Sequence, residues 1–306
     1  MRKQDWAGVF AAVTTPFRDD DTLDESMLAE HVRWLLSHRV RGIVALGSLG
    51  EGATLSGREK IRVLEVCRSA AGSQGFVIAG VSGLATRECV ELARAAAAAG
   101  CDGLMVLPPY VYRGDWRETE AHFSAVIEAT SLSCMLYNNP IAYGTDLTAA
   151  DVAELARHPN VHAVKESSGD VRRLTALRAA LDDRLALFAG LDDMIGEAAV
   201  MGAEGWIAGL VNALPQESVT LFELASAGER DAAVALYRWF LPLLRFDVVP
   251  KFVQLIKLVQ SEVGMGSERV RAPRLPLTGT EREAALGIIR DRLARRPRAV
   301  PLSPDP

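Results

Sequence analysis

We predict an α/β fold for this chain, a (β/α)8 TIM barrel followed by a C-terminal helical extension, from three features of the 306-residue sequence. Short apolar runs alternate with amphipathic stretches eight times in about the first 210 residues, which suits a barrel of this kind. The runs are apolar almost throughout, as strands buried on both faces must be. After Leu210 the strand pattern stops and helical patterns follow. An open, doubly wound sheet is the alternative on pattern alone.

The expected strands are near-continuous apolar runs. Segments such as IVALG (43–47) and LMVLP (104–108) lack the alternation of a strand with one face in water. The expected strands are Val9–Pro16, Gly42–Gly47, Phe76–Val81, Gly103–Pro109, Cys134–Tyr137, Val161–Lys165, Ala186–Gly190 and Gly205–Leu210.

The stretches between and after these runs are typical of helices. Thr86 is the expected N-cap of one helix and Gly100 its C-terminal stop, while Thr148 begins another with a capping sequence. We expect a barrel over residues 1–215 that carries the active site, an extension over 216–306, and a frayed, proline-rich end at Arg296–Pro306. The expected helices are Asp24–His38, Thr86–Ala99, Thr148–Arg157, Glu217–Gly228, Asp231–Leu244, Lys251–Val263 and Thr280–Arg295.

Composition and charge favour a soluble globular enzyme or binding protein. The net charge is −5, and the only dense basic stretch, Arg290–Arg298, is typical of a solvated helix end. Nucleic acid is therefore not an expected partner. No apolar stretch is long enough to cross a membrane, and the first residues do not resemble a signal peptide.

The cysteines and histidines lack the spacing of a metal site. His158 and His162 lie four residues apart, but Pro159 between them breaks the helix that such a pair would need. The cysteines are scattered without a CxxC pair, which indicates buried thiols in a reducing cytoplasm. They are Cys67, Cys89, Cys101 and Cys134.

In a barrel of this kind the active site lies at the C-terminal ends of the strands. Lysine, tyrosine and small hydroxyl groups gather where the apolar runs end, whereas histidines and series of carboxylates do not. This mixture favours covalent amine catalysis over metal-assisted hydrolysis. The segments are Thr14-Thr15, Gly47–Glu51, Tyr110, Tyr112, Tyr137–Pro140, Lys165–Ser168, Gly190–Asp193 and Gly209.

Lys165 is the strongest candidate for the catalytic group. The chain has five lysines among 34 basic residues, and only Lys165 ends an apolar strand. Burial disfavours the charged form of an amine, so we expect a neutral nucleophile. The alternative is a structural lysine paired with a buried carboxylate.

Two further features lie at strand ends. Tyr137 ends the preceding run, where its phenol could relay protons beside Lys165; the alternative is an aromatic plug with a locally satisfied hydroxyl. The glycine-rich turn Gly47–Gly52 offers backbone N–H groups to a carboxylate, or simply closes a βα turn. The turn matches neither a P-loop nor a dinucleotide-binding fingerprint.

Six segments, in this order, resemble the dihydrodipicolinate synthase / N-acetylneuraminate lyase family of aldolase-type barrels. They are TTPF (14–17), GSLGE (47–51), LPPY (107–110), YNNP (137–140), VKESSGD (164–170) and GLDD (190–193). The resemblance implies that Lys165 forms the Schiff base, that Tyr137 relays protons, and that Ser48 and Leu49 hold a keto-acid carboxylate. The other substrate-binding residues expected are Thr14, Tyr143, Ser167, Gly190, Ile207 and Gly209.

The chain departs from the synthase pattern of this family at three positions. The second threonine of the glycine turn is Leu49, the tyrosine contributed by a neighbouring subunit aligns with Val111, and the arginine that binds a second carboxylate aligns with Ala142. These changes argue against the synthase reaction. Tyr112 is one residue from the lost tyrosine, but an extended chain would point it to the other side.

Within the family, five segments resemble the 1-pyrroline-4-hydroxy-2-carboxylate deaminases of hydroxyproline catabolism: GSLGE, LPPYVYRGD, YNNPIAYG, VKESSGDVRR and RAPRLPL. The resemblance implies conversion of this cyclic imine to 2-oxoglutarate semialdehyde with release of ammonia. It also implies no metal or organic cofactor, and a homodimer or homotetramer. Tyr143 would offer its hydroxyl to the C4 hydroxyl of the substrate. The alternatives are a 2-keto-3-deoxy sugar acid aldolase or dehydratase, a synthase-like pyruvate aldolase, and a non-enzymatic keto-acid sensor.

Overall fold

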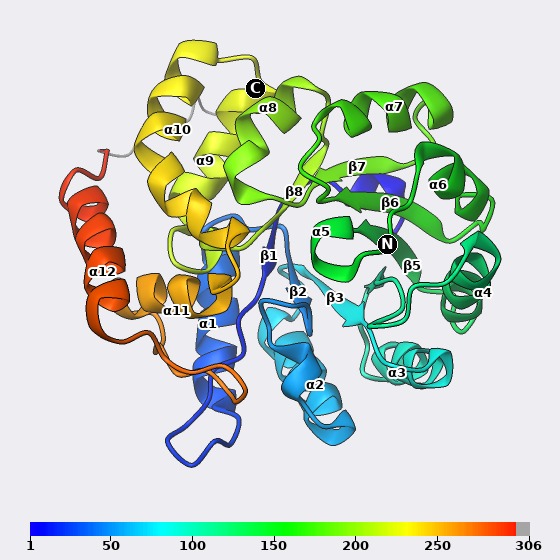
Figure 1. The fold of residues 1–306 in the computed structure, drawn as a ribbon, viewed down its shortest axis with the longest axis horizontal. Coiled ribbons are helices and arrows are strands. Elements are labelled where there is room, and N and C mark those ends of the chain that lie inside the picture. The colour runs from blue at the N-terminus through cyan, green and yellow to red at the C-terminus, as the bar shows by residue number, and fades with distance from the viewer. Residues whose placement is uncertain (298–306) are drawn as a thin grey trace.

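Eight parallel strands close into a barrel in the computed structural model, which describes residues 1–297 (Figure 1). Each strand pairs with the next along the chain, and β8 pairs with β1. The strands are β1 (Gly8–Ala12), β2 (Gly42–Ala45), β3 (Phe76–Val81), β4 (Gly103–Val106), β5 (Ser133–Asn138), β6 (Val161–Glu166), β7 (Ala186–Ala189) and β8 (Gly205–Ala208). The predicted fold is confirmed, although several strands end earlier than expected.

Helices surround the barrel and continue beyond it (Figure 1). They are α1 (Glu25–Ser37), α2 (Gly57–Ala71), α3 (Thr86–Ala98), α4 (Trp116–Ile127), α5 (Pro140–Tyr143), α6 (Ala149–Leu155), α7 (Arg172–Leu181), α8 (Ile195–Val200), α9 (Pro215–Ser226), α10 (Arg230–Leu244), α11 (Phe252–Glu262) and α12 (Gly279–Ala294). Five short 3-10 turns join them: η1 (Lys3–Asp5), η2 (Gly52–Thr54), η3 (Asp192–Met194), η4 (Leu210–Asn212) and η5 (Arg245–Val248). Each predicted helix is present.

The helix ends follow the predicted signals with one exception. Thr148 forms a capping box at the start of α6, and Gly100, with φ +81°, ends α3 in the left-handed conformation that glycine adopts freely. The prediction of Thr86 as an N-cap was wrong. Ala85 takes that position, because the Thr86 hydroxyl instead pairs with His122 Nδ1 of α4 at 2.9 Å. A tertiary partner competes here with the local cap.

Aromatic side chains fill the lower part of the barrel interior. The ring of Trp6, which precedes β1, stacks on Phe10 at 5.8 Å, and Phe188 meets both rings edge-on at 6.0 and 5.6 Å. All three side chains are fully buried. A Cβ atom on Gly42 would lie 2.6 Å from the Phe10 ring and 2.9 Å from the carbonyl oxygen of Phe76. The aromatic layer thus requires glycine at this position and closes the N-terminal end of the barrel.

Helix α10 lies beside α8 and α9, and α11 and α12 continue from it on the side of α1 (Figure 1). Helix α9 follows β8 and packs against β1, as the eighth helix of a barrel does. The division into a barrel at 1–215 and an extension at 216–306 remains a proposal, in which α9 connects the two parts. Within residues 1–297, every helix is too short or too polar to span a bilayer.

Most of the end that we expected to be frayed, residues 298–306, lies outside the described residues. Arg296, the first residue of that segment, is held in place by hydrogen bonds from its guanidinium to both carboxylate oxygens of Glu217 on α9. A bidentate pair of this kind is among the stronger charge-assisted contacts. The structure thus gives Arg296 a tertiary partner, and the expectation of fraying stays a prediction.

Gly42→Ala should destabilise the protein by about 1–3 kcal/mol, the usual range for overpacking a filled interior. The new methyl group would meet both a ring and a backbone oxygen, and the backbone cannot move aside easily. Gly287→Ala is the matched control, because that glycine lies within α12 with open space around its Cβ position. The control should gain about 0.5–1 kcal/mol. Urea unfolding of both variants measures the contrast, and equal effects would contradict it.

Candidate active site

The strand ends bring the two predicted catalytic residues together. Lys165 on β6 pairs in register with Tyr137 on β5, so their side chains leave neighbouring strands on the same face of the sheet. Tyr137 belongs to the apolar cluster inside the barrel, and Lys165 is only 6% exposed. The Nζ atom of Lys165 lies 4.2 Å from the centre of the Tyr137 ring. The aromatic face is thus the immediate neighbour of the amine.

The amine of Lys165 has no hydrogen-bonding or ion-pair partner among residues 1–297. No hydrogen bond or ion pair within residues 1–297 involves its Nζ atom. Two buried acids, Asp192 and Asp247, interact with it only through their charges. The arrangement of a structural lysine in a buried ion pair, which was the alternative for Lys165, occurs instead at Lys257. The Lys165 amine is therefore available to a ligand.

The hydroxyl of Tyr137 has one local partner. The side-chain amide of Asn139 donates to it at 3.0 Å. Because this bond uses a lone pair of the phenol oxygen, the hydroxyl proton of Tyr137 stays free to be donated. Tyr137 therefore combines a buried ring with an O–H group that can still act on a ligand.

The glycine-rich turn presents unused backbone donors. No hydrogen bond within residues 1–297 uses the backbone N–H of Ser48 or Leu49, whereas Glu51 and Gly52 close the turn through their own N–H groups. Two successive free N–H groups are suited to a carboxylate. The Leu49 side chain points away from them, into a cluster with Val253 and Ile256 of α11.

A buried ion pair anchors this turn. Glu51 has a left-handed backbone with φ +54°, and its carboxylate is fully buried. It accepts a hydrogen bond at 2.6 Å from the Nζ atom of Lys257 on α11. The same ammonium donates to the carbonyl oxygens of Thr15 at 2.8 Å and Arg269 at 2.7 Å, so all three of its protons are used. Sequence patterns missed this contact, because Lys257 reads as one more residue of an amphipathic helix.

The other residues predicted from the N-terminal and C-terminal strands serve partly as scaffold. The Thr14 hydroxyl donates to Gln260 Oε1 at 2.9 Å, so it is already engaged with α11. Ile207 lies in the interior cluster that contains Tyr137. The N–H of Gly209 donates to the carboxylate of Asp192 at 3.0 Å. Ile207 alone of these three presents its side chain to the interior around Tyr137.

Ser167 and Gly190 lie directly beside Lys165. A Cβ atom on Gly190 would lie 2.6 Å from Lys165 Cε and would overlap with Ser167 Oγ, so this position requires glycine. The Ser167 hydroxyl is buried and has no hydrogen-bond partner within the part of the chain that the structure describes. An unpaired buried hydroxyl costs free energy unless a ligand or water meets it. Ser167 is thus placed to contact whatever binds Lys165.

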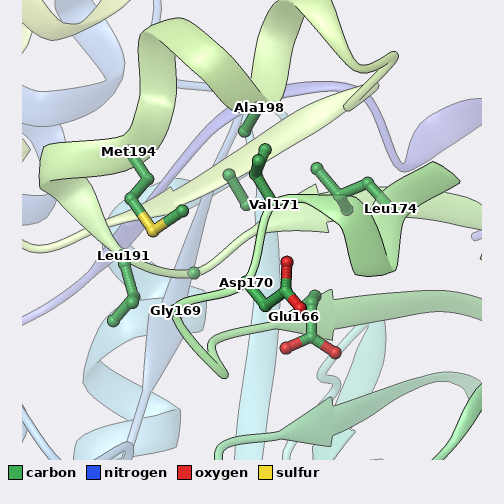
Figure 2. A pocket seen from close by; sticks show the side chains of 10 residues that line it. Glu166, Gly169, Asp170, Val171, Leu174, Leu191, Met194 and Ala198 are labelled. Atoms are coloured by element: carbon green, nitrogen blue, oxygen red, sulfur yellow. The ribbon is translucent and has the colours of Figure 1, made fainter.

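Gly190 is one of the residues that line a small cavity. Its volume is about 20 Å³, enough for a single water molecule. Figure 2 shows Met194 and Leu191 on one side of it and Glu166 and Asp170 on the other. The Glu166 carboxylate is held by Asn138 at 3.0 Å and by a backbone N–H. This cavity is too small for a keto acid.

Two acids that the sequence analysis did not assign flank Gly209. Asp192 is fully buried and accepts hydrogen bonds from Trp206 Nε1 at 3.0 Å and from the Leu210 N–H at 2.7 Å. The Asp247 carboxyl, from η5, lies against Gly209, where a Cβ atom would overlap with it. Burial raises the pKa of both carboxyls, and the proximity of Asp192 raises that of Asp247 further. Within residues 1–297, no group of three metal-ligating side chains is arranged to hold a metal ion.

The tyrosines near the open end of the barrel do not occupy the position at which the synthase pattern has its tyrosine. Tyr112 is exposed, and its hydroxyl donates to Glu118 of α4 at 3.0 Å, so it does not enter the barrel of its own chain. Val111 is exposed as well. Tyr143 of α5 instead shares a very short hydrogen bond with the Ser48 hydroxyl. Beside α5, the guanidinium of Arg113 lies against Gly144, a cation that the sequence analysis did not single out.

The family model for the dihydrodipicolinate synthetase family matches residues 5–291. The chain belongs to this family. Its members are class I aldolase-type lyases that act through a Schiff base and use pyruvate or related keto acids. The match runs through the barrel and most of the C-terminal helices, which agrees with the predicted resemblance.

Individual relatives support the same assignment. A 4-hydroxy-tetrahydrodipicolinate synthase from Anaplasma marginale is 31% identical over 283 residues, covering 92% of this chain and 94% of its own. A Rhizobium meliloti protein described as an uncharacterized DapA-like lyase is 31% identical and covers 96% and 97%. The structure of a dihydrodipicolinate synthase from Acinetobacter baumannii, complexed with pyruvate, superposes with a TM-score of 0.89 at 30% identity, covering 94% and 98%.

Folding of this chain carries a pH-dependent cost at Asp247. Its pKa in the folded protein lies above the ordinary value of about 4, so folding takes up a proton there between that value and the raised one. Stability must therefore fall as pH rises through this interval. Asp247→Asn removes the group, and its unfolding free energy should decline less between pH 5 and pH 8 than that of the wild type. Asp183→Asn, at an exposed carboxyl, is the control and should follow the wild type. Urea unfolding across this pH range gives the comparison; parallel curves for all three proteins would contradict it.

Proposed function

We propose that this protein is a Schiff-base-forming deaminase that converts 1-pyrroline-4-hydroxy-2-carboxylate to 2-oxoglutarate semialdehyde and ammonia. The observation that carries the proposal is the Lys165 amine, which is buried, lacks a hydrogen-bonding partner among the described residues and faces the ring of Tyr137. An amine in this state can attack the C2 atom of a cyclic imine or a 2-keto acid. The protonated Schiff base is itself the electron sink, so the proposal includes no metal or organic cofactor.

The reaction follows from the first attack. Lys165 adds to C2, and the ring nitrogen leaves as a primary amine, which opens the ring and forms the Schiff base. Loss of a C3 proton gives an enamine, whose electron pair expels the protonated C4 hydroxyl as water. Tautomerisation then moves the unsaturation to the terminal C–N bond. One water hydrolyses this terminal imine and releases ammonia, and a second frees the product from Lys165. The sum is one water consumed and one ammonia released.

The residues around Lys165 suit this sequence of steps. We propose that the free N–H groups of Ser48 and Leu49 hold the substrate carboxylate, and that Ser167 contacts the group attached to Lys165. Tyr137 would protonate the leaving nitrogen and oxygen atoms, a role that typically contributes about 10² to 10⁴-fold in rate. Gly190 and Ile207 shape the interior around the bound acid. Thr14 and Gly209 support these groups from behind.

The choice of substrate rests on the resemblance of the motif segments and on α5. Ala142 is exposed on α5 at the place where the synthase has its arginine. An anion without a matched cation is poorly held in a partly dry site, which argues against a second carboxylate there. Arg113 is exposed beside Gly144, and it is the nearby cation that could bind a second carboxylate in place of the missing arginine.

A second candidate function is a synthase-like pyruvate aldolase, which the names of the relatives favour. A 2-keto-3-deoxy sugar acid aldolase or dehydratase would use the same lysine. Membership of an enzyme family makes a non-catalytic sensor the weakest alternative. We also propose a homodimer or homotetramer.

Borohydride in the presence of pyruvate should trap a covalent adduct on Lys165, because its amine is free to condense with the keto group. Lys165→Ala should lose both trapping and turnover. Lys60→Ala, which changes a lysine on α2 remote from the strand ends, should keep both. Peptide mass spectrometry locates the adduct, and labelling of any other lysine in the wild type would refute the assignment.

The hydroxylated pyrroline should be consumed with stoichiometric release of ammonia, whereas pyruvate with aspartate semialdehyde should give no significant condensation. The physical reason is the lack of an arginine on α5. Ammonia and semialdehyde are assayed in parallel, with 2-keto-3-deoxy sugar acids as a third set. Arg113→Ala tests whether that cation replaces the missing clamp. Brisk condensation without ammonia release from the pyrroline would overturn the deaminase and leave Lys165 in place.

A further inference from the structure

The C-terminal extension places one carboxyl group at the open end of the barrel. Gly205 and Ile207 of β8 face the interior, since a Cβ atom on Gly205 would overlap with the Phe188 ring and Ile207 belongs to the interior cluster. Because side chains alternate along a strand, Gly209 continues this face. A Cβ atom there would overlap with the carboxyl of Asp247, from η5. Asp247 thus occupies the space that a side chain of β8 would fill.

This space borders the groups that hold the substrate in the proposed reaction. A Cβ atom on Gly209 would also lie 2.9 Å from Ile256 Cδ1, and Ile256 shares a cluster with Leu49 of the glycine-rich turn. The charge of Lys165 acts on the carboxyl of Asp247. The carboxyl therefore lies near both the reactive amine and the turn.

Two acids meet beside Gly209, and only one of them is fully used. The carboxylate of Asp192 accepts hydrogen bonds from Trp206 Nε1 and from two backbone N–H groups. Asp247 is hydrogen bonded to the backbone of Asp192, and no side chain within residues 1–297 forms a hydrogen bond or an ion pair with it. A carboxylate has about four acceptor sites. Asp247 therefore keeps acceptor capacity for a ligand.

A structural role does not require an acid at position 247. Asparagine has the same shape, and its side-chain oxygen accepts a backbone N–H equally well. An acid costs more, because burial and the charge of Asp192 both oppose its ionisation and raise the pKa of Asp247. Acids perturbed in this way gather at functional sites. A ligand that brings a cationic group to Asp247 would offset the cost.

The proposed reaction creates such a group beside Lys165. When the lysine amine displaces the ring nitrogen, that nitrogen becomes a primary amine at the far end of the opened chain. An amine ordinarily has a pKa about six units above that of a carboxyl group. A proton held by Asp247 therefore passes to the nitrogen, and an ammonium–carboxylate pair forms without a change in total charge.

We propose that Asp247 binds the amino group that ring opening frees, and that it selects substrates with a basic far end over those that end in a carboxylate. A second carboxylate would meet an acid there instead of a cation. The inference rests on the proposed function and narrows its substrate class to cyclic imines and 2-keto acids with nitrogen at the far end. Asp247 is thus a specificity-determining residue that the C-terminal extension supplies to the barrel.

Three five-carbon acids that differ at the far end test this selection. 2-Oxopentanoate ends in a methyl group, 2-oxoglutarate ends in a carboxylate, and 1-pyrroline-2-carboxylate opens to an amine. None has a C4 hydroxyl, so each stops at the Schiff base or its enamine. Each acid is incubated with the protein and the adduct is reduced with borohydride. The labelled fraction, read by intact mass, gives a half-saturating concentration for each acid.

The wild type alone gives the first comparison. 2-Oxoglutarate and 2-oxopentanoate condense by the same chemistry, so a difference between them reports the far end. The half-saturating concentration of 2-oxoglutarate should be at least about 10-fold higher, because its second carboxylate would face Asp247 and like charges repel. Equal or tighter labelling by 2-oxoglutarate would overturn the proposal.

Asp247→Asn keeps the shape of the side chain and removes its charge. Relative to 2-oxopentanoate, the half-saturating concentration of 1-pyrroline-2-carboxylate should rise at least about 10-fold, the scale of a hydrogen bond to a charged group. That of 2-oxoglutarate should fall. Ratios taken within one protein cancel the differences in condensation chemistry. A uniform change for all three acids would show that Asp247 acts on Lys165 or its Schiff base, and would overturn the proposal.

Asp193→Asn is the matched control, because it removes the next acid along the chain after Asp192 and leaves Asp247 in place. Its ratios should stay within about threefold of those of the wild type. The same shift as in Asp247→Asn would show a general effect of negative charge and would contradict a specific contact with Asp247.

The hydroxylated pyrroline separates this inference from the proposed function. Ammonia release from it by Asp247→Asn should fall at least about 10-fold in kcat/KM. A wild type that shows the expected ratios but releases no ammonia would refute the deaminase and support the selection by Asp247. An Asp247→Asn protein that releases ammonia as fast as the wild type would refute the role of Asp247 and leave the deaminase in place.

Discussion

The ion pair between Lys257 and Glu51 joins parts of the molecule that lie far apart in sequence. Its ammonium group binds the turn after β2, the carbonyl oxygen of Thr15 after β1, and that of Arg269 after α11. Removing one partner of a buried pair typically costs about 3–5 kcal/mol, because the other charge is left without water. Glu51 also holds a left-handed backbone that side chains rarely adopt. The turn that presents Ser48 therefore depends on the C-terminal helices for its shape.

Much of the site was predictable because the residues at the strand ends determine which side chains lie there. An apolar run that ends in lysine or tyrosine places that side chain at the open end of a parallel barrel, whatever the helices do. Lys165 and Tyr137 were found in this way, and their register confirms that they are neighbours. Gly190 was predicted from the family resemblance, and the structure adds the reason: Ser167 and Lys165 leave no room for a Cβ atom.

The features that were missed depend on contacts between distant segments. Lys257 looks like any helix residue until Glu51 is brought to it from 206 positions away. Asp247 became part of the site only because η5 folds against Gly209. The prediction of Thr86 as an N-cap was wrong for the same reason, since its hydroxyl is hydrogen bonded to His122 of another helix. Patterns along one strand or helix carry no information about such partners.

The aromatic layer of Trp6, Phe10 and Phe188 closes the N-terminal end of the barrel. Because this end is closed, a substrate must enter and its products must leave through the C-terminal end of the barrel. On the proposed chemistry, the substrate and two waters enter through this opening, and one water, one ammonia and the product leave through it. The water that frees the product from Lys165 must therefore enter through the same opening by which ammonia leaves. Because one end of the barrel is closed, arrivals and departures share a single path, a constraint that the individual chemical steps do not impose.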